Sequence, residues 1–175
     1  MSSIRARLSV VVGEGEEEQR FITPNNEFNS GDVVISSSGL VQVRGSSTLK
    51  DHFNPKELQI LEVIGSGACS TVRKAVYQGT TVVALKQINI FNSIGHRNQL
   101  VEEIKSLYKT DCAAIVKFYG AYLQDNNHIA IVLEYLDGGS LGNVLDQVGP
   151  VPEGAIANIA FQVLWGRNVP FCVDN

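Results

Sequence analysis

The residues best suited to chemistry begin with a glycine-rich stretch that has two explanations. Residues 64–72 read I-G-S-G-A-C-S-T-V, and Ser70 stands where a third glycine would complete the pattern G-x-G-x-x-G. A glycine loop between two antiparallel strands can cover phosphate groups, because its backbone N–H groups come close where a side chain would collide. A plain hairpin whose glycines supply positive φ angles explains the stretch equally well, so the loop alone identifies no site.

A lysine on the next expected strand gives the loop a chemical partner. Strand alternation along Val83-Ala84-Leu85-Lys86 points Ala84 and Lys86 to one face. This arrangement would place a small residue beside a flat ligand and a cation near its phosphates. A solvated surface lysine is the alternative for Lys86 taken by itself.

An expected helix supplies the counter-charge for this lysine. Apolar residues recur with helical spacing over 100–107 and form one stripe. Glu103 shares that inward face, whereas Glu102, its rival in register, points about 100° away. The joint spacing of loop, lysine and helix therefore predicts an ion pair between Lys86 and Glu103.

The elements that must position these side chains follow in a simple order. Strands run consecutively instead of alternating with helices, which indicates an α+β fold. A Rossmann-type cofactor site is disfavoured because no helix follows the glycine loop, and the Gly-Lys-Ser/Thr of a phosphate-loop NTPase is absent. The expected strands span 58–64, 71–77, 80–90, 113–122 and 128–136, and the expected helices span 96–108, 140–148 and 152–165.

The chain divides into a tail, a domain and a second, short tail. Residues 1–56 are rich in Ser, Gly, Glu and Asn and are expected to be a largely disordered regulatory tail, with a linker at 46–55. Two alternating apolar runs predict a β-hairpin at 32–44, which is marginal alone and therefore either packs against something or frays. The domain spans 57–166, and residues 167–175 form the C-terminal tail.

Composition and charge limit the classes of partner. The net charge is −4 and no long basic run occurs, so no nucleic-acid partner is expected. No apolar stretch approaches the roughly 18 residues that would span a bilayer, and the N-terminus lacks a signal-peptide pattern. Cys69, Cys112 and Cys172 are widely spaced and fit reduced thiols better than disulfides or a zinc site. We therefore expect a cytoplasmic protein with no membrane partner.

The motifs together resemble those of a protein kinase. In the family's order the chain carries the glycine-rich loop 64–72, then Ala84-x-Lys86, Glu103 and L-E-Y-L-D-G-G-S-L over 133–141. The runs R-N-Q-L-V-E-E-I, I-V-K-F-Y-G-A-Y and L-E-Y-L-D-G-G-S-L are similar to those of mitogen-activated protein kinase kinases. The resemblance implies a partial kinase domain, with a five-stranded antiparallel N-lobe sheet, its αC helix, a hinge and two C-lobe helices.

The resemblance also implies an ATP site, in which Lys86, held by Glu103, contacts the α- and β-phosphates. The backbone carbonyl of Glu134 and the N–H of Leu136 would bond the adenine edge. Cys69 would lie at the loop tip as a passive or an oxidisable thiol. The other implied site residues are Ile64, Val72 and Ala84 around the adenine, Leu133 as gatekeeper, Ser140 and Asn143 near the ribose, and Gly65, Ser66, Gly67, Ala68 and Ser70 over the phosphates.

Partners in a kinase cascade follow from the same resemblance. A full-length form would transfer phosphate from ATP, with Mg²⁺, to a Thr and a Tyr of a downstream mitogen-activated protein kinase, and an upstream kinase would act on it. A stretch similar to the family's docking peptide comprises Arg5, Arg7, Leu8 and Val10. A disordered tail explains this stretch as well.

Groups that phosphoryl transfer requires are not found in the sequence. No Asp-Phe-Gly and no Ala-Pro-Glu occur, and the only His-Arg pair, His96-Arg97, precedes the expected helix and cannot be the catalytic loop. We therefore expect no kinase activity from these 175 residues as written, and magnesium binding only in a full-length form. The second hypothesis is a non-catalytic nucleotide-binding or interaction fragment of a kinase cascade.

Overall fold

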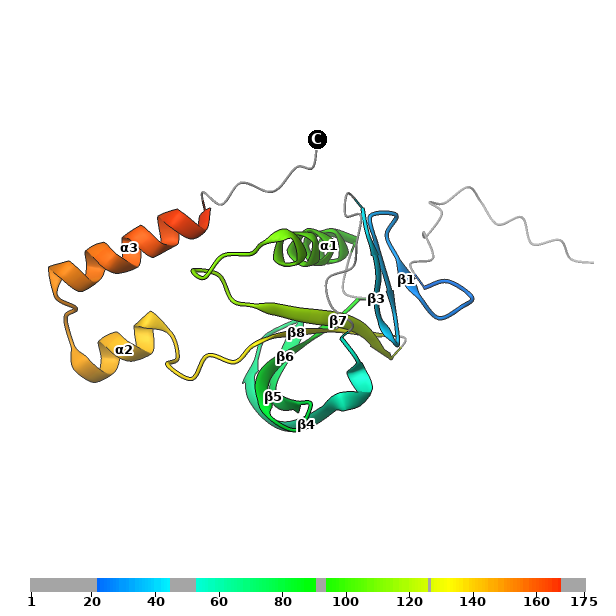
Figure 1. Ribbon diagram of the computed structural model, residues 1–175, viewed down its shortest axis with the longest axis horizontal. Helices are drawn as coiled ribbons and strands as arrows, with labels where there is room; N and C mark the ends of the chain where they lie inside the picture. The colour runs from blue at the N-terminus through cyan, green and yellow to red at the C-terminus, as the bar shows by residue number, and fades with distance from the viewer. Residues whose placement is uncertain (1–21, 45–52, 91–93, 126, 168–175) are drawn as a thin grey trace, which may run out of the picture.

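The computed structural model describes residues 22–44, 53–90, 94–125 and 127–167. The stretch that resembles a docking peptide, most of the expected linker, and Cys172 lie outside these ranges. Within them, the strands form two separate antiparallel sheets, and three α-helices accompany them (Figure 1).

The larger sheet has five strands in the order β4-β5-β6-β8-β7. Every neighbouring pair is antiparallel, so the expected α+β order is confirmed and a parallel Rossmann sheet is excluded. The β5–β6 connection turns at Gln78 and Gly79, which adopt positive φ angles of 53° and 69°. The strands are β4 Leu58–Ser66, β5 Ser70–Tyr77, β6 Thr81–Asn89, β7 Phe118–Asp125 and β8 His128–Glu134.

The prediction of a strand at 113–122 is wrong for its first half, because β7 begins only at Phe118. Residues 112–115 instead form a turn, in which the Ile115 N–H donates to the Cys112 carbonyl oxygen at 3.0 Å. The apolar side chains of this turn are half-buried or exposed, so their apolar run reflects local packing and not a strand.

Helix α1 (Ile94–Lys109) covers one face of the larger sheet. The expected apolar stripe is confirmed, since Leu100 and Ile104 are 3% and 0% exposed. Both share a core with Ile131 of β8. Ile131 is the cross-strand partner of Lys86 on β6, so α1 covers the sheet face that carries Lys86.

A second core lies on the opposite face of the larger sheet, where Leu85 and Val132 are fully buried. Phe53, which precedes a short 3₁₀ turn at residues 55–57, packs over this face. Its ring lies 5.1 Å from that of Tyr77 and 6.1 Å from that of Tyr122, measured between centroids. The chain before β4 is therefore anchored to the sheet by aromatic packing.

The smaller sheet has three strands in the order β1-β2-β3. Strands β2 and β3 form a hairpin within the region 32–44, and β1 adds a strand that the sequence pattern did not suggest. Figure 1 shows this sheet beside α1 and the edge strand β7, and its inner side chains are buried in the core that contains α1. The segment is packed, not frayed. Its strands are β1 Phe28–Asn29, β2 Val33–Ser36 and β3 Gly39–Val43.

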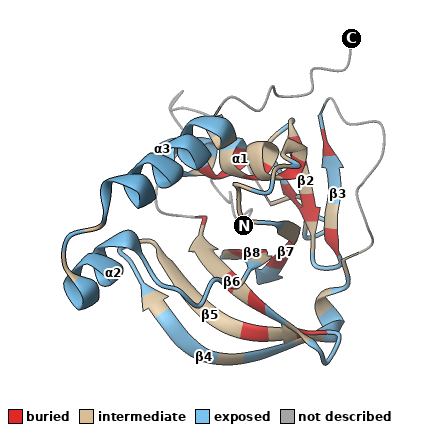
Figure 2. Ribbon diagram, turned by 60° about the vertical axis from the view of Figure 1, so that its left-hand side comes forward, coloured by how far each residue is buried: buried red, intermediate tan, exposed pale blue. Residues whose placement is uncertain are grey.

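Two helices follow β8, namely α2 (Leu141–Val148) and α3 (Glu153–Arg167). Figure 2 shows both exposed along nearly their whole length. Large apolar side chains such as Phe161 and Trp165 are 67% and 49% exposed. In the part of the chain that the structure describes, no helix has the length and apolarity needed to cross a membrane.

Candidate functional site

Lys86 and Glu103 form an ion pair between the larger sheet and α1. Lys86 Nζ lies 2.7 Å from Glu103 Oε1. The lysine extends from β6 between Val72 on β5 and Ile131 on β8. Because the two side chains are 30% and 38% exposed, the pair contributes only about 0–1 kcal/mol to stability. Its importance is therefore positional, since it fixes a cation of the sheet relative to the helix.

The neighbouring carboxylate, Glu102, points away from this pair. Glu102 Oε1 accepts a hydrogen bond from Lys105 Nζ at 2.9 Å, and the Glu102 side chain is 70% exposed. The structure thus brings together Lys86 and Glu103, as the helical register predicted, and leaves the rival carboxylate facing solvent.

The glycine-rich loop connects β4 and β5 above this ion pair. The strands β4 and β5 do pair as an antiparallel hairpin, but neither Gly65 nor Gly67 has a positive φ angle, so a need for positive φ does not explain these glycines. A Cβ placed on Gly67 would come no nearer than 3.7 Å, to Ser70 Oγ, and one on Gly65 no nearer than 3.8 Å, to Val72 Cβ. The fold tolerates side chains at both positions, and their absence leaves backbone that a ligand can approach.

Residues at the tip of the loop are open to solvent. Ser66, Gly67 and Ala68 are exposed, whereas Cys69 and Ser70 are half-buried. The Gly67 N–H donates to the Ser70 carbonyl oxygen at 2.8 Å, and the Cys69 carbonyl oxygen accepts from the backbone N–H at the end of β6 at 3.3 Å. Cys69 is a free thiol. The tip is therefore closed by backbone hydrogen bonds and tied to β6.

A cavity of about 150 Å³ lies between the loop and α1. Cys69 and Ser70 line it on the loop side, and Lys86, His96 and Glu103 line it on the other sides. A cation, a carboxylate and loop backbone thus meet in one hollow, which is the arrangement expected of a site for a charged, phosphate-bearing ligand.

A larger hollow of about 440 Å³ lies between the loop tip and the β7–β8 turn, and it is not lined by the ion pair. It is lined in part by Gln87, which alternates with Lys86 along β6 and so faces the other side of the sheet. Partial burial raises the pKa of Asp125 here, but hydrogen bonds from the Asn127 N–H and the His128 ring outweigh it and leave that pKa below its usual value. We assign the site to the smaller cavity because the ion pair between Lys86 and Glu103 lines it.

Apolar residues continue the Lys86 face toward the hinge. Ala84 lies on β6 next to Leu133 on β8, and both are half-buried. Val72 is half-buried on β5, and Ile64 on β4 is 44% exposed. The resemblance implies that these positions surround an adenine. On the Lys86 face, Val72 lies directly opposite Lys86, and Ala84 and Leu133 lie farther along the strands toward the end of β8.

Lys74 is a residue of this face that sequence reasoning missed. It lies opposite Ala84 in the β5–β6 pairing, and its Nζ lies 5.1 Å from the centroid of the Tyr135 ring, just after β8. Nζ is also 4.0 Å from Glu62 Oε1. Strand alternation from Val72 would have identified the face of Lys74, but the contact with Tyr135 depends on the path of the chain after β8.

Glu134, the last residue of β8, has hydrogen-bond partners outside the sheet. The Glu134 N–H donates to the Lys117 carbonyl oxygen at 2.9 Å, and the Glu134 carboxylate accepts from the Lys117 N–H at 3.2 Å. Leu136 is 65% exposed. The end of β8 is thus tied to the chain entering β7, which fixes the point from which the segment after β8 departs.

Ser140 and Asn143 cap the N-terminus of α2. Ser140 Oγ accepts from the Asn143 N–H at 3.2 Å, and Asn143 Oδ1 accepts from the Ser140 N–H at 2.9 Å. This reciprocal capping box satisfies backbone donors of the first helical turn. The sequence pattern S-x-x-N signals such a cap, and sequence reasoning considered only a ribose contact for these residues. Among the described residues, no cluster of His, Cys, Asp and Glu could hold a metal ion.

The sequence matches the family described as protein kinase domain over residues 58–171. The dual specificity mitogen-activated protein kinase kinase 1 of Dictyostelium discoideum is 33% identical over 145 residues, which cover 79% of this chain and 22% of that protein. Mitogen-activated protein kinase kinase 3 of Arabidopsis thaliana is 38% identical over an alignment that covers 79% of this chain and 27% of that protein. Mitogen-activated protein kinase kinase 1c of Physcomitrium patens is 32% identical over an alignment that covers 93% of this chain and 50% of that protein.

A solved structure is similar as well. The crystal structure of Rad53 1-466 in complex with AMP-PNP aligns with a TM-score of 0.59 and 33% sequence identity, over 63% of this chain and 30% of that one. The chain spans between about a fifth and a half of the length of the three curated relatives named above. The chain therefore belongs to the protein kinase family, and it resembles the mitogen-activated protein kinase kinases.

Proposed function

We propose that this chain carries the ATP-binding half of a mitogen-activated protein kinase kinase. The observation that supports it best is the 2.7 Å ion pair between Lys86 and Glu103, which lies beneath the loop of residues 64–72. Lys86 would neutralise the α- and β-phosphates, and Glu103 would hold its ammonium group in place. The loop would cover the phosphates with backbone N–H groups.

The residues present fit such a ligand. Side chains are lacking at Gly65 and Gly67 although the fold would accept them, which suits close approach of phosphate to backbone. The apolar end of the same face, with Ala84 and Leu133, suits the flat adenine. The backbone of Glu134 and Leu136 would bond its edge, and Ser140 and Asn143 would contact the ribose while capping α2.

The substrate and partners are proposed from the relatives. Three are mitogen-activated protein kinase kinases, and one of them is called dual specificity. The intact enzyme would accordingly phosphorylate a Thr and a Tyr of a downstream mitogen-activated protein kinase in the cytoplasm, under control of an upstream kinase. The stretch 5–10, with Arg5, Arg7, Leu8 and Val10, would dock that substrate.

We further propose that these 175 residues bind nucleotide without transferring phosphate. Phosphoryl transfer needs a base and magnesium ligands, which kinases supply from a catalytic loop and an Asp-Phe-Gly segment that this sequence does not contain. Incubation with ATP and a mitogen-activated protein kinase tests this, and phosphorylated Thr or Tyr above the level of a Lys86→Ala control would contradict it.

Calorimetric titration tests the nucleotide site itself. Lys86→Ala removes a charge-assisted contact, so it should weaken ATP binding about tenfold or more. The same variant should leave the binding of adenosine unchanged, because adenosine has no phosphate. Lys56→Ala alters an exposed lysine before β4 and should change neither affinity. No ATP binding by the wild type, or equal binding by Lys86→Ala, would refute the proposed site.

A further inference from the structure

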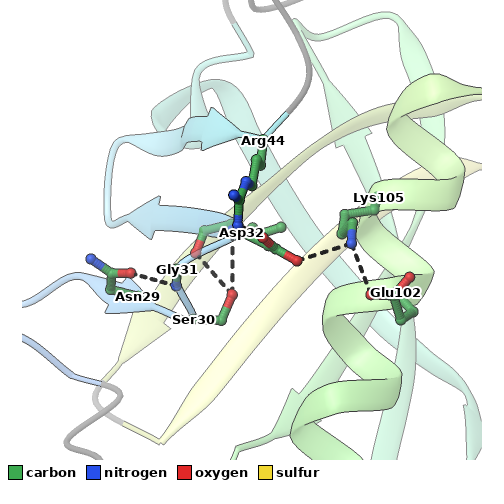
Figure 3. Close-up of polar contacts among 8 residues, drawn as sticks. Asn29, Ser30, Gly31, Asp32, Arg44, Glu102 and Lys105 are labelled. Carbon is green, nitrogen blue, oxygen red and sulfur yellow. Dashed lines mark hydrogen bonds and ion pairs between the residues drawn. The ribbon is translucent and has the colours of Figure 1, made fainter. Parts of the chain in front are cut away.

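Helix α1 is held from two sides, by a charged group on the larger sheet and by another in the turn between β1 and β2 of the smaller sheet. Glu103 binds Lys86 of the larger sheet, and Lys105 Nζ lies 3.1 Å from Asp32 Oδ2 of the smaller sheet region (Figure 3). On an α-helix, the side chains of residues two positions apart project in directions about 200° apart around the helix axis. The two ion pairs therefore hold nearly opposite sides of the same helical turn.

The turn between β1 and β2 presents the Asp32 carboxylate to the helix in a fixed geometry. The Gly31 N–H donates to Asn29 Oδ1 at 2.8 Å, and the Val33 N–H donates to Ser30 Oγ at 3.1 Å (Figure 3). Gly31 has a φ angle of +81°, which a residue with a Cβ adopts only with strain. Because the residues on either side are hydrogen-bonded, little freedom remains in the backbone of Asp32.

Asp32 has a sheltered contact with α1 and an exposed contact within its own sheet. Lys105 is 21% exposed, whereas Arg44, which lies 3.4 Å from Asp32 Oδ1, is 78% exposed. Hydrogen bonds from Lys105 and then Arg44 lower the pKa of Asp32, and hydrogen bonds to Glu102 and Asp32 raise that of Lys105. Both partners of the sheltered contact are therefore charged at neutral pH.

Apolar packing joins the small sheet to the same helix. Phe28, Val33 and Ile35 are each 0% exposed, and they share one core with Val101 and Ile104 of α1. The small sheet is therefore fixed against the helix through a buried surface as well as through Asp32. A rotation of α1 that moved Glu103 from Lys86 would also break the contact with Asp32 and disturb this core.

We propose that Asp32 is a positioning residue for the nucleotide site. Through Lys105 it fixes the rotation of α1 that brings Glu103 to Lys86, so the smaller sheet controls the geometry of a site that it does not touch. The proposal rests on the proposed ATP-binding function. It assigns a role to β1–β3, for which the sequence motifs provide none.

A double-mutant cycle on the full chain tests the proposal by ATP binding. Asp32→Asn should weaken ATP binding about two- to fivefold, as expected for loss of a partly exposed ion pair. In a Glu103→Gln background the same change should have no further effect, because Asp32 acts through Glu103. Arg44→Gln removes only the exposed partner and should leave ATP affinity unchanged. An unchanged affinity in Asp32→Asn, or an equal loss in the Glu103→Gln background, overturns the proposal.

A second pair of variants guards against misfolding of the small sheet. Lys105→Met removes the charge from α1 without altering β1–β3 and should reproduce the loss, while Lys105→Arg retains the charge and should preserve affinity. If Asp32→Asn does not fold, the two Lys105 variants test the proposal in its place. Equal ATP affinity of Lys105→Met and the wild type would then overturn the proposal.

Hydrogen exchange without nucleotide separates this inference from the proposed function. Backbone amides of α1 should exchange about two- to fivefold faster in Asp32→Asn, with β8 unchanged. If the wild type binds no ATP, the proposed function fails, but faster exchange in α1 still supports the role of Asp32 in holding the helix. Unchanged exchange in α1 overturns that role whether or not ATP binds.

Discussion

Glu102 and Glu103 are consecutive on α1, yet their carboxylates bind lysines on different elements. Glu103 Oε1 lies 2.7 Å from Lys86 Nζ on β6, and Glu102 Oε1 lies 2.9 Å from Lys105 Nζ on α1 itself. The two residues share side-chain type, charge and helix, and they differ in direction. The register of the helix thus decides which lysine each carboxylate orients.

Glu103→Gln should weaken ATP binding about three- to tenfold, because Lys86 remains present but loses the charge that orients it. Glu57→Gln removes the same charge from an exposed residue before β4 and should keep ATP affinity within about twofold. Calorimetric titration at fixed ionic strength compares the two. Equal losses in both variants would mean that net charge, not the ion pair with Lys86, controls binding.

Gly67→Ala should separate ligand binding from stability. The added Cβ meets nothing closer than 3.7 Å and the φ angle is not positive, so thermal stability should be unchanged or slightly higher. ATP binding should weaken, since the methyl group occupies backbone surface that phosphate would approach. Gly79→Ala is the converse control, because at φ +69° it should cost about 1 kcal/mol of stability without altering ATP affinity. Wild-type ATP affinity in Gly67→Ala would argue against a phosphate-covering loop.

Gly120→Ala should destabilise the larger sheet by about 1–3 kcal/mol, the usual cost of overpacking. A Cβ on Gly120 would lie 2.6 Å from Cγ of Phe53, so the ring would have to move from its contacts with Tyr77 and Tyr122. Urea unfolding measures the loss. In a Phe53→Leu background the same substitution should cost clearly less, and an equal cost in both backgrounds would show that the ring is not the obstacle.

Local periodicity made much of the larger sheet and its charged pair predictable. Alternation along β6 placed Lys86 and Ala84 on one face, and helical spacing placed Glu103 with Leu100, because both patterns depend only on near neighbours in the chain. The same reasoning failed at 113–117, where an apolar run forms a turn that ends before β7. Apolar composition alone does not distinguish a strand from a packed turn.

The position of the smaller sheet could not be predicted in the same way. Asp32 and Lys105 are 73 residues apart, and no periodic pattern connects them. Alternation in residues 32–44 shows which side chains of the hairpin are apolar, but not which surface buries them. The contact of Lys74 with Tyr135 was missed for a similar reason, since it depends on the course of the chain beyond β8.

The Asp32 ion pair should leave a signature in the pH dependence of stability. Hydrogen bonds from Lys105 and then Arg44 hold the pKa of Asp32 below its ordinary value of 3.8. A carboxyl with a lowered pKa in the folded state contributes stability that is complete above its unfolded value and is lost as pH falls through the folded one. The difference in unfolding free energy between wild type and Asp32→Asn should therefore be constant near neutral pH and shrink below pH 3.8.

The alkaline side provides an independent check of the same contact. Hydrogen bonds to Glu102 and then Asp32 raise the pKa of Lys105, so its contribution should be complete below pH 10.5 and decline as pH rises through the folded value. Burial also raises the pKa of Tyr122, which lies in the core on the opposite face of the larger sheet. Its titration affects the wild type and Asp32→Asn equally, so it cancels in the difference between their unfolding free energies. Urea unfolding of wild type and Asp32→Asn across this range measures the profile. A difference that is already zero at neutral pH, or that grows on acidification, would contradict an ion pair between Asp32 and Lys105.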